Sequence, residues 1–130
     1  MPKTIDSRKT IGQWGEDLAL EYLRSKNYHI LAKNYKKPWG EIDIIAEKER
    51  IVVFCEVKTN SKELGFSFSP ELRVNSKKGR HILRTAKIFI NDFYKGQERE
   101  WRVDIISITL RRFEGKALIR HFKNVLTDWN

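Results

Sequence analysis

Cysteine is nearly absent from this sequence, with Cys55 as the single example, so no disulfide can form within the chain. Its apolar neighbours favour a buried, unreactive thiol, and a reducing compartment fits this composition. The opening MPKTIDSRKT lacks the apolar core of a signal peptide, and no later apolar run is long enough to span a membrane. We therefore expect a cytoplasmic protein with no membrane partner.

Proline, repeats and low-complexity tracts are also scarce. The 130 residues include 3 prolines, and no linker or internal repeat divides the chain. Apolar residues make up 40% and charged residues 33%, a balance too hydrophobic for a disordered chain and too polar for a membrane protein. A single domain over residues 1–130 is the expectation.

Acidic residues are outnumbered, because 17 Asp and Glu stand against 26 Lys and Arg and leave a net charge of +9. Such a surface carries a positive field that attracts polyanions. Nucleic acid is therefore the first partner to consider, although the same charge is compatible with a basic protein that binds none.

The spacing of apolar residues predicts the secondary structure. Residues 11–26 and 76–94 repeat at helical intervals, and Thr10 with Gln13 resembles a capping box before the first helix. Five strands are expected at residues 29–35, 41–46, 51–58, 101–110 and 117–122, with a long loop at 59–75. The order αβββαββ predicts an α/β protein whose mixed central sheet is flanked by helices.

Charged residues interrupt the two apolar strands of the central hairpin. Glu41 and Asp43 lie on its first strand, and Glu56 and Lys58 on its second. A charge in a buried sheet needs a partner or a shifted pKa. Structural pairing and a bound metal are both ways to meet that need.

The hairpin register decides which of these charges meet. With an even number of loop residues, we expect Asp43 to face Phe54 and Glu41 to face Glu56, so that the carboxylates share one side; an odd loop would separate them. Carboxylates placed opposite each other repel unless a cation lies between them. Since only oxygen ligands are available, Mg²⁺ or Mn²⁺ is favoured over zinc.

Two further residues complete the set. Lys58 shares a strand face with Glu56 and could bring its ammonium to a phosphate or an attacking water. Glu16 lies on a helical stripe with Ala19 and Leu20, which predicts that it faces the sheet, although an acid near a helix N-terminus is also favourable by itself. Together these groups suit phosphodiester hydrolysis.

Ordered matches run along most of the chain. They comprise Gly12, GED at 15–17, GEIDII at 40–45, VFCEVK at 53–58, Lys78, Ala86 and RVD at 102–104. In these residues the chain resembles the YraN-like family of bacterial proteins, which has the PD-(D/E)XK endonuclease fold. It is also similar to archaeal Holliday-junction resolvases, which carry an early helical Glu, then Asp, then E-x-K on a hairpin. The resemblance implies a restriction-endonuclease-like core.

The resemblance also implies roles for individual residues. Asp43 and Glu56 would hold the metal together with the backbone carbonyl of Val57, and Glu41 would support them. Asn60 stands where many family members have a basic residue, which weakens the case for a phosphate contact there. The residues that would fill the catalytic positions are Glu16, Asp43, Glu56 and Lys58.

Basic residues suggest where a polyanion would lie. They could follow a phosphate backbone without reading its sequence, or form an ordinary solvated surface. Trp39, beside them, could stack on a base or anchor its turn. The nucleic-acid-binding candidates are Lys36, Lys37, Arg73, Lys77, Lys78, Arg80 and Arg84.

The sequence thus predicts a Mg- or Mn-dependent nuclease acting on nucleic acid, with DNA favoured over RNA and branched or structured DNA in view. A non-catalytic nucleic-acid-binding or assembly module on the same fold is the alternative. Because resolvases cut paired strands, the resemblance also raises a homodimer, for which the sequence identifies no surface.

Overall fold

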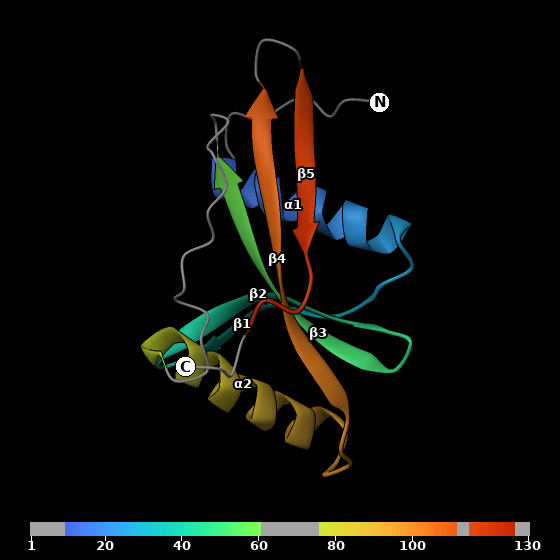
Figure 1. Ribbon diagram of the computed structural model, residues 1–130, viewed down its shortest axis with the longest axis vertical. Helices are drawn as coiled ribbons and strands as arrows, with labels where there is room; N and C mark the ends of the chain where they lie inside the picture. Colours follow the sequence, from blue (N-terminus) through green and yellow to red (C-terminus); the bar gives the residue numbers. More distant parts are fainter. Residues whose placement is uncertain (1–9, 61–75, 112–114, 127–130) are drawn as a thin grey trace.

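The computed structural model describes residues 10–60, 76–111 and 115–126, and the predicted order of elements is confirmed there (Figure 1). Most boundaries agree with the prediction within two residues, although β3 takes in the first two residues of the expected loop. The remaining residues of that loop, 61–75, lie outside the described part. The elements are α1 (Ile11–Ser25), β1 (His29–Lys37), β2 (Gly40–Lys48), β3 (Ile51–Asn60), α2 (Lys77–Phe93), β4 (Glu100–Arg111) and β5 (Lys116–Phe122).

The strands form one mixed sheet in the order β1-β2-β3-β4-β5. Neighbouring strands are antiparallel except β3 and β4, which are parallel. A parallel pair needs a crossover between its strands, and α2 is part of that connection. The chain is therefore a mixed α/β protein, as the sequence predicts.

Both helices begin at polar caps. Thr10 and Gln13 exchange side-chain and backbone hydrogen bonds at the start of α1, which confirms the predicted capping box. At the start of α2, the Ser76 hydroxyl accepts a hydrogen bond of 2.9 Å from the backbone N–H of Gly79. These bonds satisfy amide groups that the first turn of a helix leaves without partners. None of the helices in the described ranges has the length and apolar character needed to cross a bilayer.

The two helices pack on opposite faces of the sheet. Figure 1 shows α1 behind β3–β5 and α2 at the lower end of the sheet. Along β3, Val53 and Cys55 pack with the α1 cluster, whereas Val52 and Phe54 pack with the α2 cluster. Burying one such aliphatic or aromatic side chain contributes about 1.5–3 kcal/mol. The Cys55 thiol is buried, as predicted, and burial raises its pKa.

The β2–β3 turn corrects the predicted register. The loop does hold an even number of residues, but it consists of Glu49 and Arg50, both with left-handed φ, which is the geometry of a tight type I′ hairpin. Phe54 therefore pairs with Ile45, and the predicted pairings of Phe54 with Asp43 and of Glu41 with Glu56 are wrong. Asp43 and Glu56 lie beyond the last pair of this ladder; Asp43 lines a hollow with Glu16 of α1, whereas Glu56 lines a cavity beside α2.

The sheet divides between β2 and β3. Pairing of these strands ends at Ile44 and Cys55, whereas β3 stays paired with β4 as far as Asn60 and Thr109. Figure 1 shows β3 continuing beside β4 after it has left β2. We call this point the fork. Asp43 and Glu56 are the first residues beyond it on their respective strands.

Candidate active site at the fork of the sheet

Carboxylates from three elements gather at the fork, namely Glu16 of α1, Glu41 and Asp43 of β2, and Glu56 of β3. Burial raises the pKa of Asp43, and the negative charges of Glu56 and Glu41 raise it further. Burial also raises the pKa of Glu16, with added repulsion from Asp43 and Glu41. Each of the four groups thus lies within electrostatic reach of at least one other, and we call them the acidic cluster.

Asp43 is fixed by a backbone contact across the fork. Its Oδ2 accepts a hydrogen bond of 2.8 Å from the N–H of Val57. This bond occupies a strand donor that β2 no longer pairs, and by itself it lowers the pKa of Asp43. The carboxylate therefore points toward β3.

A close contact between α1 and β3 determines where Glu16 lies. A Cβ atom at Gly15 would sit 1.9 Å from the Thr59 Oγ1, so only glycine fits at this point of the helix. A buried helical glycine costs about 1 kcal/mol in helix propensity, which is tolerable where it permits such an approach. The next residue, Glu16, lines a hollow of about 80 Å³ together with Asp43.

Asn34 is a member of the site that the sequence analysis missed. It has a left-handed φ of 50° within β1, a conformation that Asn tolerates better than most residues. In the amide orientation that matches donors with acceptors, its nitrogen donates to Glu16 Oε1 at 2.9 Å and to Glu41 Oε1 at 3.0 Å. The one signal in the sequence is an Asn inside an otherwise favourable strand, between Lys33 and Tyr35.

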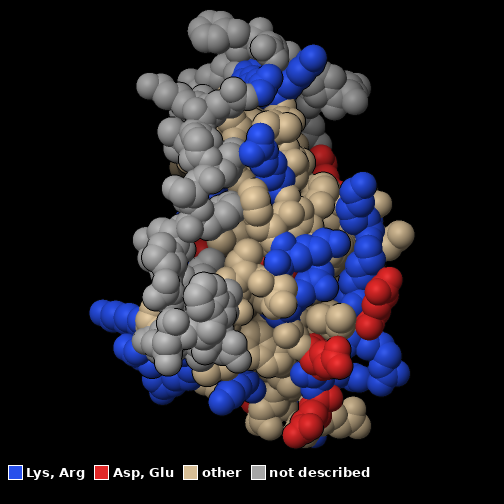
Figure 2. Space-filling model, in the orientation of Figure 1, with Lys and Arg blue, Asp and Glu red and all other residues tan. Residues whose placement is uncertain are grey.

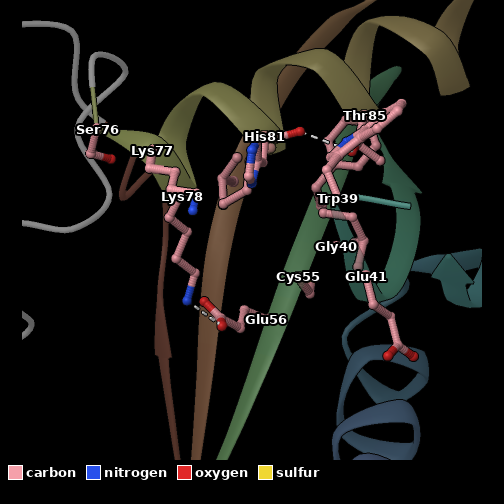
Figure 3. A pocket seen from close by; sticks show the side chains of 14 residues that line it. Trp39, Gly40, Glu41, Cys55, Glu56, Ser76, Lys77, Lys78, His81 and Thr85 are labelled. Carbon is pink, nitrogen blue, oxygen red and sulfur yellow. Dashed lines mark hydrogen bonds and ion pairs between the residues drawn. The ribbon is translucent and has the colours of Figure 1, made fainter. Parts of the chain in front are cut away.

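Glu56 is paired with a lysine of α2. The Lys78 Nζ lies 2.6 Å from Glu56 Oε1, and Figure 3 shows the lysine side chain extending from the helix down to the carboxylate. The other carboxylate oxygen, Oε2, is buried and has no hydrogen-bond partner among the described residues. Lys78, predicted as a phosphate contact, thus neutralises part of the acidic cluster.

The donor chemistry of the fork suits a hard divalent cation. All candidate ligands are oxygens, the carboxylates repel one another, and Glu56 Oε2 has no partner in the part of the chain that the structure describes. However, no three His, Cys, Asp or Glu side chains within residues 10–60, 76–111 and 115–126 are placed so that they could hold one ion together. Asp43 is turned toward Val57 and Glu56 toward Lys78, so a shared cation requires side-chain rotation.

Lys58 is the remaining predicted catalytic residue. It is partly buried on β3, and its backbone pairs with Ser107 of β4. Strand alternation places it on the same side of β3 as Glu56, two residues further along. It therefore lies on the portion of β3 that extends past the fork.

A cavity of about 530 Å³ lies between α2 and strands β2, β3 and β4. Figure 3 shows Glu56 and Lys78 on one side of it and Trp39 on the other. Trp39 donates from Nε1 to the Thr85 Oγ1 at 2.8 Å, and the Arg84 guanidinium lies 3.7 Å from its ring centroid. The sequence left two roles open for Trp39, stacking on a base and anchoring its turn. These contacts attach its ring to α2 and so correspond to the anchoring role.

Basic residues form an exposed row on α2. Lys77, Arg80, Arg84 and Lys87 follow one another at intervals of three or four residues, and each is exposed. At 1.5 Å per residue the row is about 15 Å long. We call these four residues the basic row. Figure 2 shows Lys and Arg side chains at the lower left, where the N-terminal end of α2 lies in Figure 1.

The remaining predicted nucleic-acid contacts are Lys36, Lys37 and Arg73, which lie outside the basic row. Lys36 is exposed near the end of β1, and the Nζ of Lys37 lies 5.1 Å from the Tyr35 ring centroid. Arg73 lies outside the described residues.

A second polar group is buried away from the fork. Asp104 is fully buried and accepts hydrogen bonds from Arg102 Nε at 3.0 Å and from the backbone of Asn124 at 2.9 Å; its Oδ2 lies 2.7 Å from His121 Nε2. Burial alone would raise the pKa of Asp104, but these bonds together hold it below its ordinary value. The network joins β4, β5 and the segment after β5.

Fold and site together define a mixed α/β protein with an acidic cluster where its five-stranded sheet divides. The chain belongs to the uncharacterised protein family UPF0102, whose sequence model matches residues 15–108. The expected membership of the YraN-like family is thereby confirmed.

Three relatives illustrate the extent of the similarity. The UPF0102 protein of Fervidobacterium nodosum is 37% identical over 118 residues, which cover 90% of this chain and 82% of the relative. That of Carboxydothermus hydrogenoformans is 36% identical over 120 residues, or 92% and 98% of the two chains. That of Caldicellulosiruptor bescii is 40% identical over 100 residues, or 77% and 82%.

Proposed function

We propose that this chain is a metal-dependent nuclease that hydrolyses phosphodiester bonds in nucleic acid. The observation that carries the proposal is the acidic cluster beside a basic helix. Burial raises the pKa of Asp43 and of Glu16, and repulsion from neighbouring carboxylates adds to it. Neighbouring carboxylates whose ionised forms are destabilised in this way are typical of functional sites.

The assignment to the PD-(D/E)XK fold is part of the proposal. It is supported by the order αβββαββ, by the mixed sheet, and by the positions of Asp43 and Glu56 on adjacent strands of one hairpin. In the same resemblance, the early helical acid corresponds to Glu16, which lies beside Asp43 here.

The residues would divide the work as follows. Asp43, Glu56 and the backbone carbonyl of Val57 would hold Mg²⁺ or Mn²⁺, which supplies Lewis acidity toward a phosphate oxygen and an activated water. Lys58 would place its positive charge beside the phosphate and stabilise the charge that develops there. Glu16 and Glu41 would orient the site through their shared partner Asn34.

The substrate would lie along α2. The basic row offers cations over about 15 Å, a length at which one strand of B-form DNA passes several phosphates at about 3.4 Å each. Contacts of this kind do not read sequence, so we propose structure-selective binding, with DNA favoured over RNA and the cytoplasm as the compartment. A homodimer stays a prediction that light scattering would decide.

Cleavage assays on purified variants test the nuclease proposal. Asp43→Ala and Glu56→Ala should each abolish Mg²⁺- or Mn²⁺-dependent cleavage, while Asp92→Ala, an exposed acid near the end of α2, should leave it unchanged. The substrates are linear duplex, single-stranded and branched DNA, each with an RNA counterpart, with EDTA as the blank. Wild-type cleavage rates in both site variants would refute the assignment.

A non-catalytic nucleic-acid-binding or assembly module is the second candidate. It is favoured by the arrangement in which Lys78 already donates to Glu56 Oε1 and the Val57 N–H to Asp43 Oδ2. On that candidate, wild type would form a salt-sensitive complex but would neither bind Mn²⁺ at the fork nor cleave any substrate of the panel.

A further inference from the structure

The cavity beside α2 is unlike the rest of the candidate site because its inner surface is mainly apolar. With a volume of about 530 Å³ it falls in the range of pockets that accept small organic groups. The acidic cluster lies at its edge, since both Glu41 and Glu56 contribute to the lining. Its apolar lining residues are Ile42, Phe54, Ile82 and Val103.

One wall of the cavity is held in place by its own contacts. Trp39 is bonded to Thr85, and Arg84 lies against its ring, so the indole is fixed relative to α2. Across from it, Figure 3 shows Lys78 reaching Glu56 and His81 projecting from the helix. The cavity is therefore a formed feature with an aromatic wall.

The surroundings restrict what could enter. The basic row on α2 attracts a polyanion, yet a phosphate or a sugar hydroxyl gains little from an apolar interior. The group that fits is apolar on its faces, planar, and attached to a polyanionic backbone. An unstacked nucleobase has these properties, whereas the bases of an intact duplex are paired and stacked.

We propose that this cavity receives one unpaired nucleobase, so that the substrate is nucleic acid with an extrahelical or single-stranded nucleotide. The inference rests on the nucleic-acid partner of the proposed function and gives it a substrate class. Glu56 belongs to both the cavity and the acidic cluster, so a base in the cavity keeps its own phosphodiester beside the carboxylates. Recognition and the candidate chemistry are thereby joined at one residue.

A binding experiment on wild type tests the inference without cleavage. Fluorescence anisotropy in EDTA would compare three labelled DNA duplexes: one fully paired, one with a single unpaired nucleotide, and one with an abasic nucleotide at that bulge. Stacking of one base commonly changes affinity by about 5- to 150-fold, so the bulge that carries its base should bind at least about fivefold tighter than the abasic bulge. Equal affinity for the two bulges would overturn the inference.

A filled cavity supplies the second arm. Ile82→Phe adds an aromatic ring inside the cavity, and Leu83→Phe adds the same ring one position along α2, outside the lining. Ile82→Phe should lose the preference for the base while keeping its affinity for paired duplex, and Leu83→Phe should keep the preference. Circular dichroism checks the fold of both variants, and the comparison on wild type does not depend on either.

The outcomes separate this inference from the nuclease proposal. A base preference without cleavage of any substrate would support the cavity and refute the nuclease. Cleavage together with equal affinity for both bulges would support the nuclease and refute the role of the cavity. Failure of wild type to bind any of the three oligonucleotides would refute the inference together with the nucleic-acid partner on which it rests.

Discussion

Replacing Lys78 by methionine tests whether the Lys78–Glu56 ion pair occupies a place that a divalent cation would take. The ammonium lies 2.6 Å from Glu56 Oε1, and its charge also acts on Asp43. Methionine keeps the apolar stem but removes the positive charge. If a cation binds at the fork, it must compete with Lys78 for Glu56, so the substitution should tighten cation binding.

The size of the effect follows from the geometry of the pair. Two unit charges at 2.6 Å attract by about 1.6 kcal/mol at the dielectric constant of water. The side chains are 40% and 30% exposed, so the net worth of the pair is that of a screened ion pair, about 0.2–1 kcal/mol. Lys78→Met should therefore bind Mn²⁺ about 1.4- to 5-fold more tightly than wild type at neutral pH.

Isothermal titration calorimetry with Mn²⁺ measures this change. Lys77→Met is the matched control, because it removes the same charge from the preceding, exposed position on α2. Glu56→Gln should weaken binding strongly and so report that the ion is at the fork. Equal affinities for Lys78→Met and Lys77→Met, or weaker binding by Lys78→Met, would refute the competition argument.

Three predictions concern stability. Gly15→Ala should lower the free energy of unfolding in urea by about 1–3 kcal/mol, because its Cβ would lie 1.9 Å from the Thr59 Oγ1; Thr59→Ala should recover part of the loss, and an unchanged midpoint would contradict the close packing. Asp104→Asn should cost about 3–5 kcal/mol at pH 7 by breaking its buried pair with Arg102. Folding lowers the pKa of Asp104, so the stabilisation from its ionised form is present above pH 3.8 and is lost as the pH falls below that value. If the difference in unfolding free energy between wild type and Asp104→Asn stayed constant on acidification, this prediction would be refuted. Asp43→Asn should stabilise the fold by about 0.5–2 kcal/mol at pH 7, because a pKa raised by folding means that stability is lost as the pH rises above 3.8; a lower Tm would count against this.

Local signals in the sequence are sufficient to predict the helices and strands. The capping box of Thr10 and Gln13, and the apolar spacing behind it, depend on neighbours within one helical turn. The predicted hairpin register is wrong because the turn depends on the left-handed φ of Glu49 and Arg50. Asn-Gly is the usual sequence signal of such a turn, and Glu-Arg gives no such signal.

Contacts between distant elements limited the prediction of the site. Asn34 meets Glu16 and Glu41 only after α1 has packed beside β1 and β2, so no sequence spacing reports it. Lys78 could have been separated from the basic row, since it lies four residues before buried Ile82 and hence on the inward side of α2. Gly15 was recognised as part of a family motif, whereas its steric reason, Thr59, is far along the chain.

The fork makes the spacing of its carboxylates depend on strand geometry as well as on side chains. Asp43 moves with the β1–β2 hairpin, and Glu56 moves with the β3–β4 pair, because strand pairing between them has already ended. A small change in the angle between these two arms would widen or narrow the gap between the carboxylates. If the proposed cation binds at the fork, mechanical strain on the hairpin would thus alter its affinity while every residue of the acidic cluster stayed the same.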